Sequence, residues 1–332
     1  MKKVLICLFL GIFLLSGCGK YGEDDIVQDL TKKISQSKAY YVDGTLEIVN
    51  NDEVYNYDVE VAYKKDNNYR VSLTNTSNDH TQVILKNKDG VYVVTPSLNK
   101  SFKFQSDWPY SNSQIYLLES IINDIKADKE RKFTEEKDSY VFTTAVNYPN
   151  NRSLVKQKVE MSKKLKLKTV KVYNSNSVIC MTMKFNKIDY SPTFKKNYFE
   201  LDTVMKTYAV DDDKAIETSN LEDSIYPLLV PTGTKLTNEE KVEKETGERI
   251  IMTFDGEKPF LLVEETANVE DEFTIIPTYG EPYQLMDTLG VMTDNSLSWT
   301  SNGIEYYLVS DVLNQDELVE VAQSINIVQT MK

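Results

Sequence analysis

The stretch Tyr55-Asn56-Tyr57-Asp58-Val59-Glu60-Val61-Ala62-Tyr63 alternates apolar or aromatic residues at odd positions with mostly polar residues at even positions. A period of two is the pattern of a β-strand, because successive side chains point to opposite faces of a sheet. The alternation therefore predicts a strand with one apolar face, made of Tyr55, Tyr57, Val59, Val61 and Tyr63.

Similar strand patterns continue to about residue 190, separated by turn signals such as Asp89-Gly90. Two helical patterns accompany them, at Asp24 to Lys38 and at Ser113 to Ala127, the second with Ser113 as a candidate N-cap. Antiparallel hairpins are expected because the connections are short. The further predicted strands are Tyr69–Leu73, Thr81–Lys86, Val91–Thr95, Ser101–Gln105, Ser139–Asn147, Leu154–Ser162, Lys168–Tyr173 and Val178–Ile188.

The C-terminal third predicts a second, smaller unit. Strand patterns at Ile250–Phe254 and Phe260–Glu264 precede a hairpin at Trp299–Ser310, whose Asn302-Gly303 turn readily takes positive φ, and a closing helix is expected at Gln315–Gln323. The chain is thus expected to be α+β throughout. A curved antiparallel half-barrel with a helical lid spans 24–200, an acidic linker 201–222 and a small α+β domain 223–332.

The net charge of the chain also changes near residue 200. Residues 18–200 carry 28 Lys and Arg against 24 Asp and Glu, a net of +4, whereas residues 201–332 carry 8 against 27, a net of −19. This asymmetry supports a boundary near residue 200 and argues against nucleic acid as a partner. The acidic part either stands away from an anionic membrane surface or serves solubility alone.

The N-terminus has the pattern of a secretory signal peptide. Lys2 and Lys3 precede an apolar run from Val4 to Leu15, which is shorter than the ~20 residues of a spanning helix. Leu15-Ser16-Gly17-Cys18 then resembles a bacterial lipobox. We expect a signal peptide at 1–17, a diacylglyceryl group on Cys18, a tether at 18–23, and a location on the outer face of the cell membrane.

Motifs for catalysis, cofactors or metals are missing from the sequence. There is one histidine, Gly is scarce at 12 residues, and no phosphate loop, zinc-spaced cluster or nucleophile elbow occurs. An EF-hand alignment of Asp211-Asp212-Asp213 fails, because Ile216 stands where the loop needs Gly. Cys180, within a strand pattern, is expected to be a small buried hydrophobe. The sequence predicts a protein that is not an enzyme and that uses neither cofactor nor metal.

A curved sheet closed by a few short helices has two alternative interiors: a core filled by its own side chains, or an apolar cavity that can hold acyl chains. Alternation leaves both open, and a slip of one residue would exchange the two faces of a strand. In the second case Leu118, Ile121 and Ile122 would form the lid. The cavity lining would be Val59, Val61, Val71, Leu73, Val83, Leu85, Val91, Val93, Phe102, Phe104 and Trp108.

The order of helix, hairpin strands, interrupting helix and further strands resembles the LolA/LolB-like superfamily. A specific match lies in Gln82-Val83-Ile84-Leu85-Lys86-Asn87 and in Gly90-Val91-Tyr92-Val93-Val94-Thr95-Pro96-Ser97-Leu98-Asn99-Lys100-Ser101-Phe102-Lys103-Phe104-Gln105-Ser106-Asp107-Trp108-Pro109, which looks like the YdcC-type sporulation lipoproteins. This resemblance implies an open half-barrel with a helical lid. In a host without an outer membrane it implies a holder, sensor or assembly factor rather than a shuttle.

The C-terminal part resembles the DUF4367 family, through Tyr226-Pro227, Pro231-x-Gly233 and the pattern from Trp299 to Ile325. That resemblance implies architecture more than mechanism.

Two functions follow as hypotheses. The first is an anchored lipoprotein that binds an amphiphile, either a lipid or a lipoprotein, during envelope or spore-envelope assembly. The second is a regulatory lipoprotein whose half-barrel is filled and which binds an envelope protein, such as a cell-wall enzyme or a sigma-factor regulator, through its Tyr-rich surface and acidic domain. Hydrolysis through acidic residues is a third, minor hypothesis.

Overall fold

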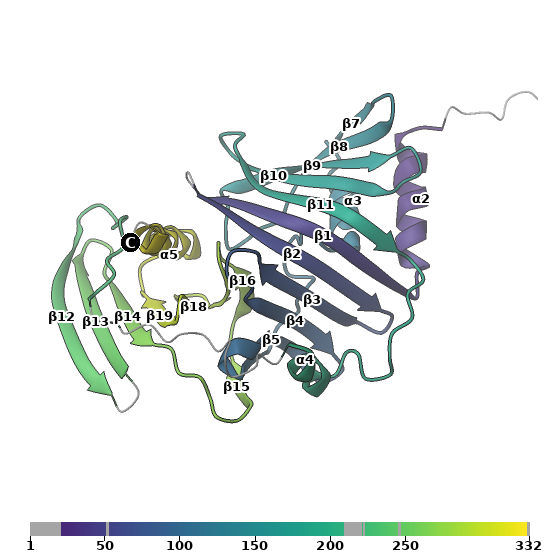
Figure 1. The fold of residues 1–332 in the computed structure, drawn as a ribbon. Coiled ribbons are helices and arrows are strands. Elements are labelled where there is room, and N and C mark those ends of the chain that lie inside the picture. The colour runs from purple at the N-terminus through teal and green to yellow at the C-terminus, as the bar shows by residue number, and fades with distance from the viewer. Residues whose placement is uncertain (1–20, 51–52, 209–220, 222, 245–246, 331–332) are drawn as a thin grey trace, which may run out of the picture.

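The computed structural model describes residues 21–50, 53–208, 221, 223–244 and 247–330. Most of the chain forms two open sheets (Figure 1). The larger sheet has twelve strands in the order β15-β6-β5-β4-β3-β2-β1-β11-β10-β9-β8-β7. Its first eleven strands are β1 (Ala39–Asn50), β2 (Glu53–Lys64), β3 (Asn68–Asn75), β4 (Thr81–Asn87), β5 (Gly90–Thr95), β6 (Lys100–Phe104), β7 (Lys132–Glu135), β8 (Ser139–Ala145), β9 (Leu154–Ser162), β10 (Leu167–Asn174) and β11 (Ile179–Asp189).

These eleven strands pair antiparallel with their neighbours, and both halves of the sheet share one core. Two helices, α2 (Glu23–Ser35) and α3 (Leu118–Ala127), cover that core. In α2 the Asp25 carboxylate accepts a hydrogen bond from the Gly22 backbone N–H at 2.9 Å, which satisfies a donor at the helix start. The predicted α+β class and the antiparallel first sheet are confirmed.

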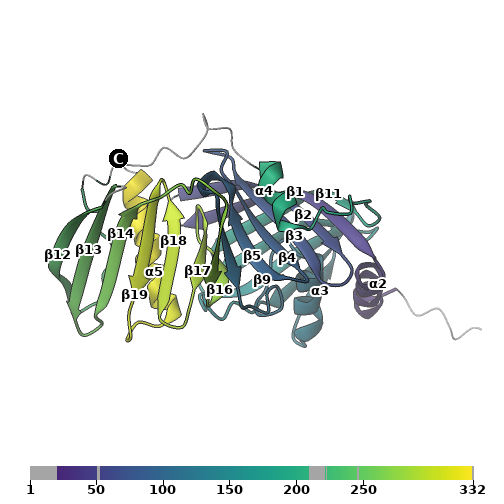
Figure 2. The ribbon, with the colours of Figure 1, turned by 90° about the horizontal axis from the view of Figure 1, so that it is seen from below.

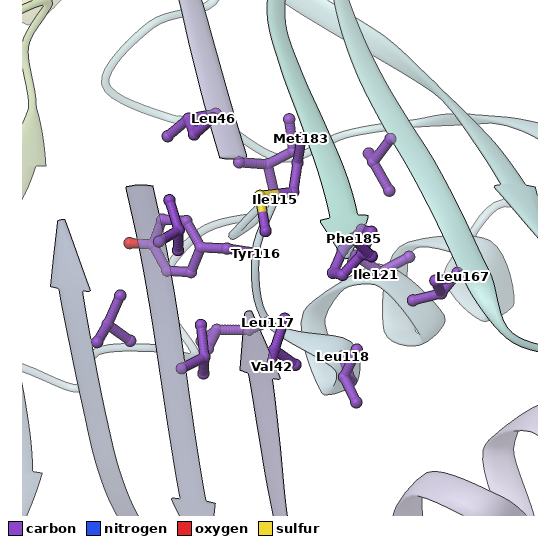
Figure 3. Close-up of a cluster of buried hydrophobic side chains, with 14 of the residues drawn as sticks. Val42, Leu46, Ile115, Tyr116, Leu117, Leu118, Ile121, Leu167, Met183 and Phe185 are labelled. Atoms are coloured by element: carbon purple, nitrogen blue, oxygen red, sulfur yellow. The ribbon is translucent and has the colours of Figure 1, made fainter. Parts of the chain in front are cut away.

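The second helix is shorter than predicted. It begins at Leu118, five residues after Ser113, because Ser113 pairs with the end of the sheet instead of capping a helix. The Ser113 backbone N–H donates to the Asn147 carbonyl at 2.7 Å. Ile115, Tyr116 and Leu117 therefore enter the core from a turn that precedes the helix, in which the Leu117 N–H donates to the Gln114 carbonyl at 3.2 Å. Figure 3 shows this segment and α3 beside Val42, Leu46, Met183 and Phe185.

A separate cluster covers the opposite face of the sheet. Helix α4 (Leu201–Tyr208) lies there with Val204 and Met205 buried against strands β4 and β5. Val83 and Leu85 belong to this cluster, so their predicted orientation toward the α2 and α3 face was wrong by one residue, and Ile84 faces that core instead. The predicted linker at 201–222 likewise begins with a packed helix, because its first residues carry an apolar face; 209–220 and 222 lie outside the described residues.

The second sheet has seven strands in the order β12-β13-β14-β19-β18-β17-β16. Helix α5 (Gln315–Thr330) lies across one of its faces (Figure 2). The Asn302-Gly303 turn joins β18 to β19 with positive φ at both residues, as predicted. Its strands are β12 (Thr234–Lys244), β13 (Gly247–Gly256), β14 (Phe260–Thr266), β16 (Glu281–Gln284), β17 (Leu289–Met292), β18 (Ser296–Ser301) and β19 (Ile304–Val309).

The chain after β14 returns to the first sheet before it completes the second. Strand β15 (Thr274–Thr278) pairs parallel with β6, an arrangement that the sequence did not predict. Leu289 and Val291 of β17 pack into the core of the first sheet. The stretch assigned to the second domain therefore closes one edge of the first sheet, and the two units share a continuous apolar contact.

The predicted signal peptide at 1–17 and the lipidation site at Cys18 lie outside the described residues. In the part of the chain that the structure does describe, none of the helices combines the length and the apolar character that crossing a membrane requires.

Replacing Leu118 by Ala should lower the free energy of unfolding by about 2–5 kcal/mol, because the side chain is fully buried in the shared core and its loss leaves a cavity. Lys126→Ala, on the exposed side of the same helix, should change it by less than about 0.5 kcal/mol. Urea denaturation of both variants measures the difference. Equal effects would contradict the placement of α3 in the core.

Candidate ligand-binding cavity

The face that was predicted to line a cavity is mostly filled. Phe102 is half-buried against the core between α2, α3 and the first sheet, and the other members of the predicted set on this face are buried in it. Val93 and Phe102 also border a small cavity of about 180 Å³ that faces β17 and β19 of the second sheet. The buried residues are Val59, Val61, Val71, Leu73, Val91, Val93, Phe104, Trp108, Leu118, Ile121 and Ile122.

A cavity of about 420 Å³ lies at the end of this face, where the two sheets meet. Of the predicted lining residues, it is bordered by Trp108. The remaining wall comes from the end of β1, the segment 112–116, the loop around Asn151, the start of β11, and the turn between β16 and β17. Gln323 of α5 also reaches it.

Strand alternation supplies the apolar part of the wall. Leu46 and Ile48 are two residues apart on β1 and share a face, and Met181 lies opposite Ile48 on β11. From the second unit, Leu285 and Met286 complete the wall. The cavity is therefore made by both units and exists only when they are in contact.

Cys180 lies in the wall rather than in the core where it was expected. Its side chain is partly exposed, and partial burial raises the pKa of the thiol. A neutral thiol is a weak nucleophile, so this site does not activate Cys180. Cys180 nevertheless places a free thiol in a residue of the cavity wall, where a thiol reagent can report whether the cavity is occupied.

Three tyrosines, Tyr116, Tyr148 and Tyr283, also border the cavity. Burial raises the pKa of all three phenols, which therefore stay neutral at physiological pH. Each phenol supplies polarity without charge.

Two polar atoms at the wall are buried without a hydrogen-bond partner: Asn50 Nδ2, a donor, and Gln284 Oε1, an acceptor. Gln284 is held in place by its other amide atom, since Nε2 donates to the Leu285 carbonyl at 2.7 Å. An unsatisfied buried polar group costs about 1–3 kcal/mol. Asn50 and Gln284 thus each border the cavity and hold one buried, unpaired amide atom, which a ligand would reach once the side chain turned toward the cavity.

The segment 112–116 is fixed by a buried carboxylate behind it. Asp124 of α3 accepts hydrogen bonds from Ser113 Oγ at 3.0 Å and from Gln157 Nε2 at 2.9 Å. Burial raises the pKa of Asp124 to about 6, and the two hydrogen bonds oppose that shift. Asp124 therefore joins one wall of the cavity to β9 through two hydrogen bonds.

The described residues contain no group of three or more His, Cys, Asp or Glu side chains that could hold a metal ion.

Over 332 residues, the chain is 38% identical to sporulation protein YdcC of Bacillus subtilis strain 168, and the match covers 98% of each protein. This chain belongs to the YdcC family of sporulation proteins. No family model matches the chain, and the resemblance of residues 223–332 to DUF4367 remains a prediction.

Solved structures with similar folds include MucB in the Pseudomonas aeruginosa MucA/MucB complex, at 11% identity and a TM-score of 0.32 over 90% of this chain and 96% of that one. A chain of the complex between the CwlD amidase and the GerS lipoprotein of Clostridioides difficile is 18% identical, with a TM-score of 0.31 over 54% and 99%. The LolA superfamily protein NE2245 of Nitrosomonas europaea is 11% identical, with a TM-score of 0.32 over 54% and 98%.

In this member of the YdcC family, sequence reasoning found Trp108 and missed the rest of the cavity wall. The alternation of Tyr55–Tyr63 indicates a strand in the middle of the sheet, where side chains fill the space. The end of β1 gives a similar signal, since Leu46 and Ile48 also alternate. Nothing in the sequence shows that residues 282–289 cover that end.

Replacing Asp124 by Asn should flatten the dependence of stability on pH between about 4 and 6. The folded pKa is raised from 3.8 to about 6, so in this window the folded chain binds more protons than the unfolded chain, and the free energy of unfolding falls as pH rises. Asp124→Asn removes this titration. Ser113→Ala keeps the carboxyl but removes a donor that lowers its pKa, so the fall should extend to higher pH. Urea unfolding from pH 3.5 to 7.5 tests both, and an unchanged slope in Asp124→Asn would exclude this residue as the source.

Proposed function

We propose that this chain is a lipid-anchored, extracytoplasmic lipoprotein of the sporulating cell that binds an acyl-bearing amphiphile without catalysing a reaction. The observation that carries the proposal is the 420 Å³ cavity between the two sheets. Its volume falls in the range of about 300–1,000 Å³ typical of small-molecule sites, and its wall combines apolar side chains with a few polar atoms. The relative's name, sporulation protein YdcC, supports the cellular setting.

The anchor is part of the proposal and rests on the lipobox at Cys18. Two acyl chains hold a protein stably at a membrane, since each buried methylene contributes ~0.8 kcal/mol. The absence of a catalytic role is supported by the wall itself. Its described residues include no carboxylate, imidazole or amine that could act as general acid or base, and burial keeps the Cys180 thiol neutral.

A second candidate, a protein-interaction module, is favoured by the face of the second sheet opposite α5, which the first sheet covers only in part. Ile251, Val263 and Tyr307 lie side by side on three neighbouring strands, on the face opposite α5. Tyr307 is 44% exposed. The net charge of −19 over residues 201–332 would favour a basic partner.

Native mass spectrometry, after expression with lipid present, tests acyl binding directly. The protein starts at residue 18 and carries Cys18→Ala, so that Cys180 is its one thiol. We expect one bound acyl ligand per chain and slower modification of Cys180 by a thiol reagent when the ligand is bound, because both occupy the same cavity.

A matched pair of variants locates the site. Leu154→Trp places a large ring in the cavity and should reduce occupancy at least about tenfold, whereas Val155→Trp, one position along β9 and pointing away, should leave it unchanged. A ligand-free mass with every lipid offered would contradict acyl binding and favour the protein-interaction module. Equal occupancy in the two variants would place the ligand elsewhere.

A further inference from the structure

The wall of the large cavity is polar in part but uncharged. Among its described residues there is no Asp, Glu, Lys, Arg or His. Carboxamides, hydroxyls and phenols take their place. The polar lining residues are Asn50, Asn112, Ser113, Gln114, Tyr116, Tyr148, Asn151, Ser153, Asn174, Tyr283, Gln284 and Gln323.

Charged side chains close to the cavity are engaged with other groups. Arg152 is 83% exposed and faces Asp316, with its Nε 4.0 Å from a carboxylate oxygen. Lys156 donates to Ser177 Oγ at 2.9 Å. Asp124 lies behind Ser113 and accepts hydrogen bonds from protein donors. A ligand inside the cavity would therefore find no described charge of opposite sign in the wall.

This arrangement discriminates between head groups. Moving an ionised carboxylate or phosphate out of water costs several kcal/mol unless a cation compensates it. Moving a neutral amide or hydroxyl out of water costs much less free energy, and this cost arises only if the group stays without a hydrogen-bond partner. The carboxamides, hydroxyls and phenols of the wall offer donors and acceptors to such a group, and Asn50 Nδ2 and Gln284 Oε1 are a buried donor and a buried acceptor of wall residues that have no partner.

We propose, building on the acyl-binding function above, that the cavity selects an acyl chain whose buried end carries an uncharged group with both a hydrogen-bond donor and an acceptor, and that it rejects ionised head groups. A carboxamide and a hydroxylated ester share this chemistry. In this proposal the Asn50 and Gln284 side chains turn toward such a group, so that Asn50 donates to its carbonyl and Gln284 accepts from its N–H or O–H.

Three ligands with one acyl chain and different heads test the selection: myristamide, monomyristoylglycerol and myristate, each below its micelle concentration. Binding is measured by native mass spectrometry and by the slowing of Cys180 modification at pH 8. We expect at least one neutral ligand to bind about tenfold or more tightly than myristate, because only the carboxylate must be buried without a counter-charge. Whichever neutral ligand binds more tightly identifies the source of the head group.

The outcomes separate the two proposals. Myristate that binds as tightly as both neutral ligands overturns head-group selection and leaves acyl binding standing. Failure of all three ligands to bind overturns both.

Substitutions at the two unpartnered atoms supply an independent readout. Asn50→Leu keeps the size of the side chain and removes the donor, so the preference for the neutral head should fall severalfold while the chain still binds. Gln284→Met does the same for the acceptor if Asn50→Leu proves unstable in urea. Asn176→Leu, at an exposed turn outside the wall, is the control and should keep the full preference. A preference unchanged in both Asn50→Leu and Gln284→Met would contradict the assignment.

Discussion

The side chain of Gln82 holds the two sheets together, and the cavity depends on it. Its Oε1 accepts from the Leu289 backbone N–H at 2.6 Å and from Thr288 Oγ1 at 3.1 Å, while Nε2 donates to Thr95 Oγ1 at 3.2 Å. The Gln82 side-chain amide thus accepts, at the start of β17, a backbone hydrogen bond of the kind that a neighbouring strand would accept. Tyr57 adds a second link, donating from its hydroxyl to the Met286 carbonyl at 2.5 Å. Both bonds position the turn that forms the roof of the cavity.

The first sheet is filled where an open carrier would be hollow, and its aromatic residues give the reason. Tyr40 stacks on Tyr63 and Tyr63 packs at a tilt against Tyr69, with ring centroids 4.9 Å apart in each pair, and Tyr69 meets Trp108 edge-on at 5.8 Å. The Tyr40 hydroxyl is satisfied by Glu119 of α3 at 2.5 Å, which joins the helix to this stack. Rings of this size, packed against α2 and α3, fill the middle of this face, and the 420 Å³ cavity lies beyond Trp108, at the end of the strands. Of the two alternative interiors, the filled core occupies the middle of the sheet and the cavity lies at its end.

Local patterns predicted many of the strands and helices of this chain, because each depends on the residues within it, but they missed α4 and the strands β1, β7, β12, β15, β16 and β17. The alternation of Tyr55–Tyr63, the apolar face of Asp24–Lys38 and the Asn302-Gly303 turn all appear as expected. Val83 and Leu85 show the limit, since the run from Val83 to Leu85 is apolar at every position, both faces of β4 are covered, and alternation cannot choose between them. The parallel pairing of β15 with β6 depends on contacts between residues more than 170 positions apart, as does the roof of the cavity. The periodicity of a single segment cannot predict such long-range contacts.

The position of the cavity bears on how the proposed anchor and the proposed ligand relate. Helix α2 stands at one end of the first sheet and α5 at the other (Figures 1 and 2). Strand β1 connects the two regions, leading from the side of α2 to Asn50 in the cavity wall over 12 residues, which corresponds to roughly 40 Å of extended chain. An anchor at Cys18, which precedes α2 in the sequence, would place the cavity at the end of the first sheet that is far from the membrane. The acidic second unit lies farther still, where repulsion from anionic lipid favours the same orientation. Under the proposed anchoring and ligand, such a placement would suit a ligand delivered from an opposing surface or partner better than one drawn from the lipids around the anchor.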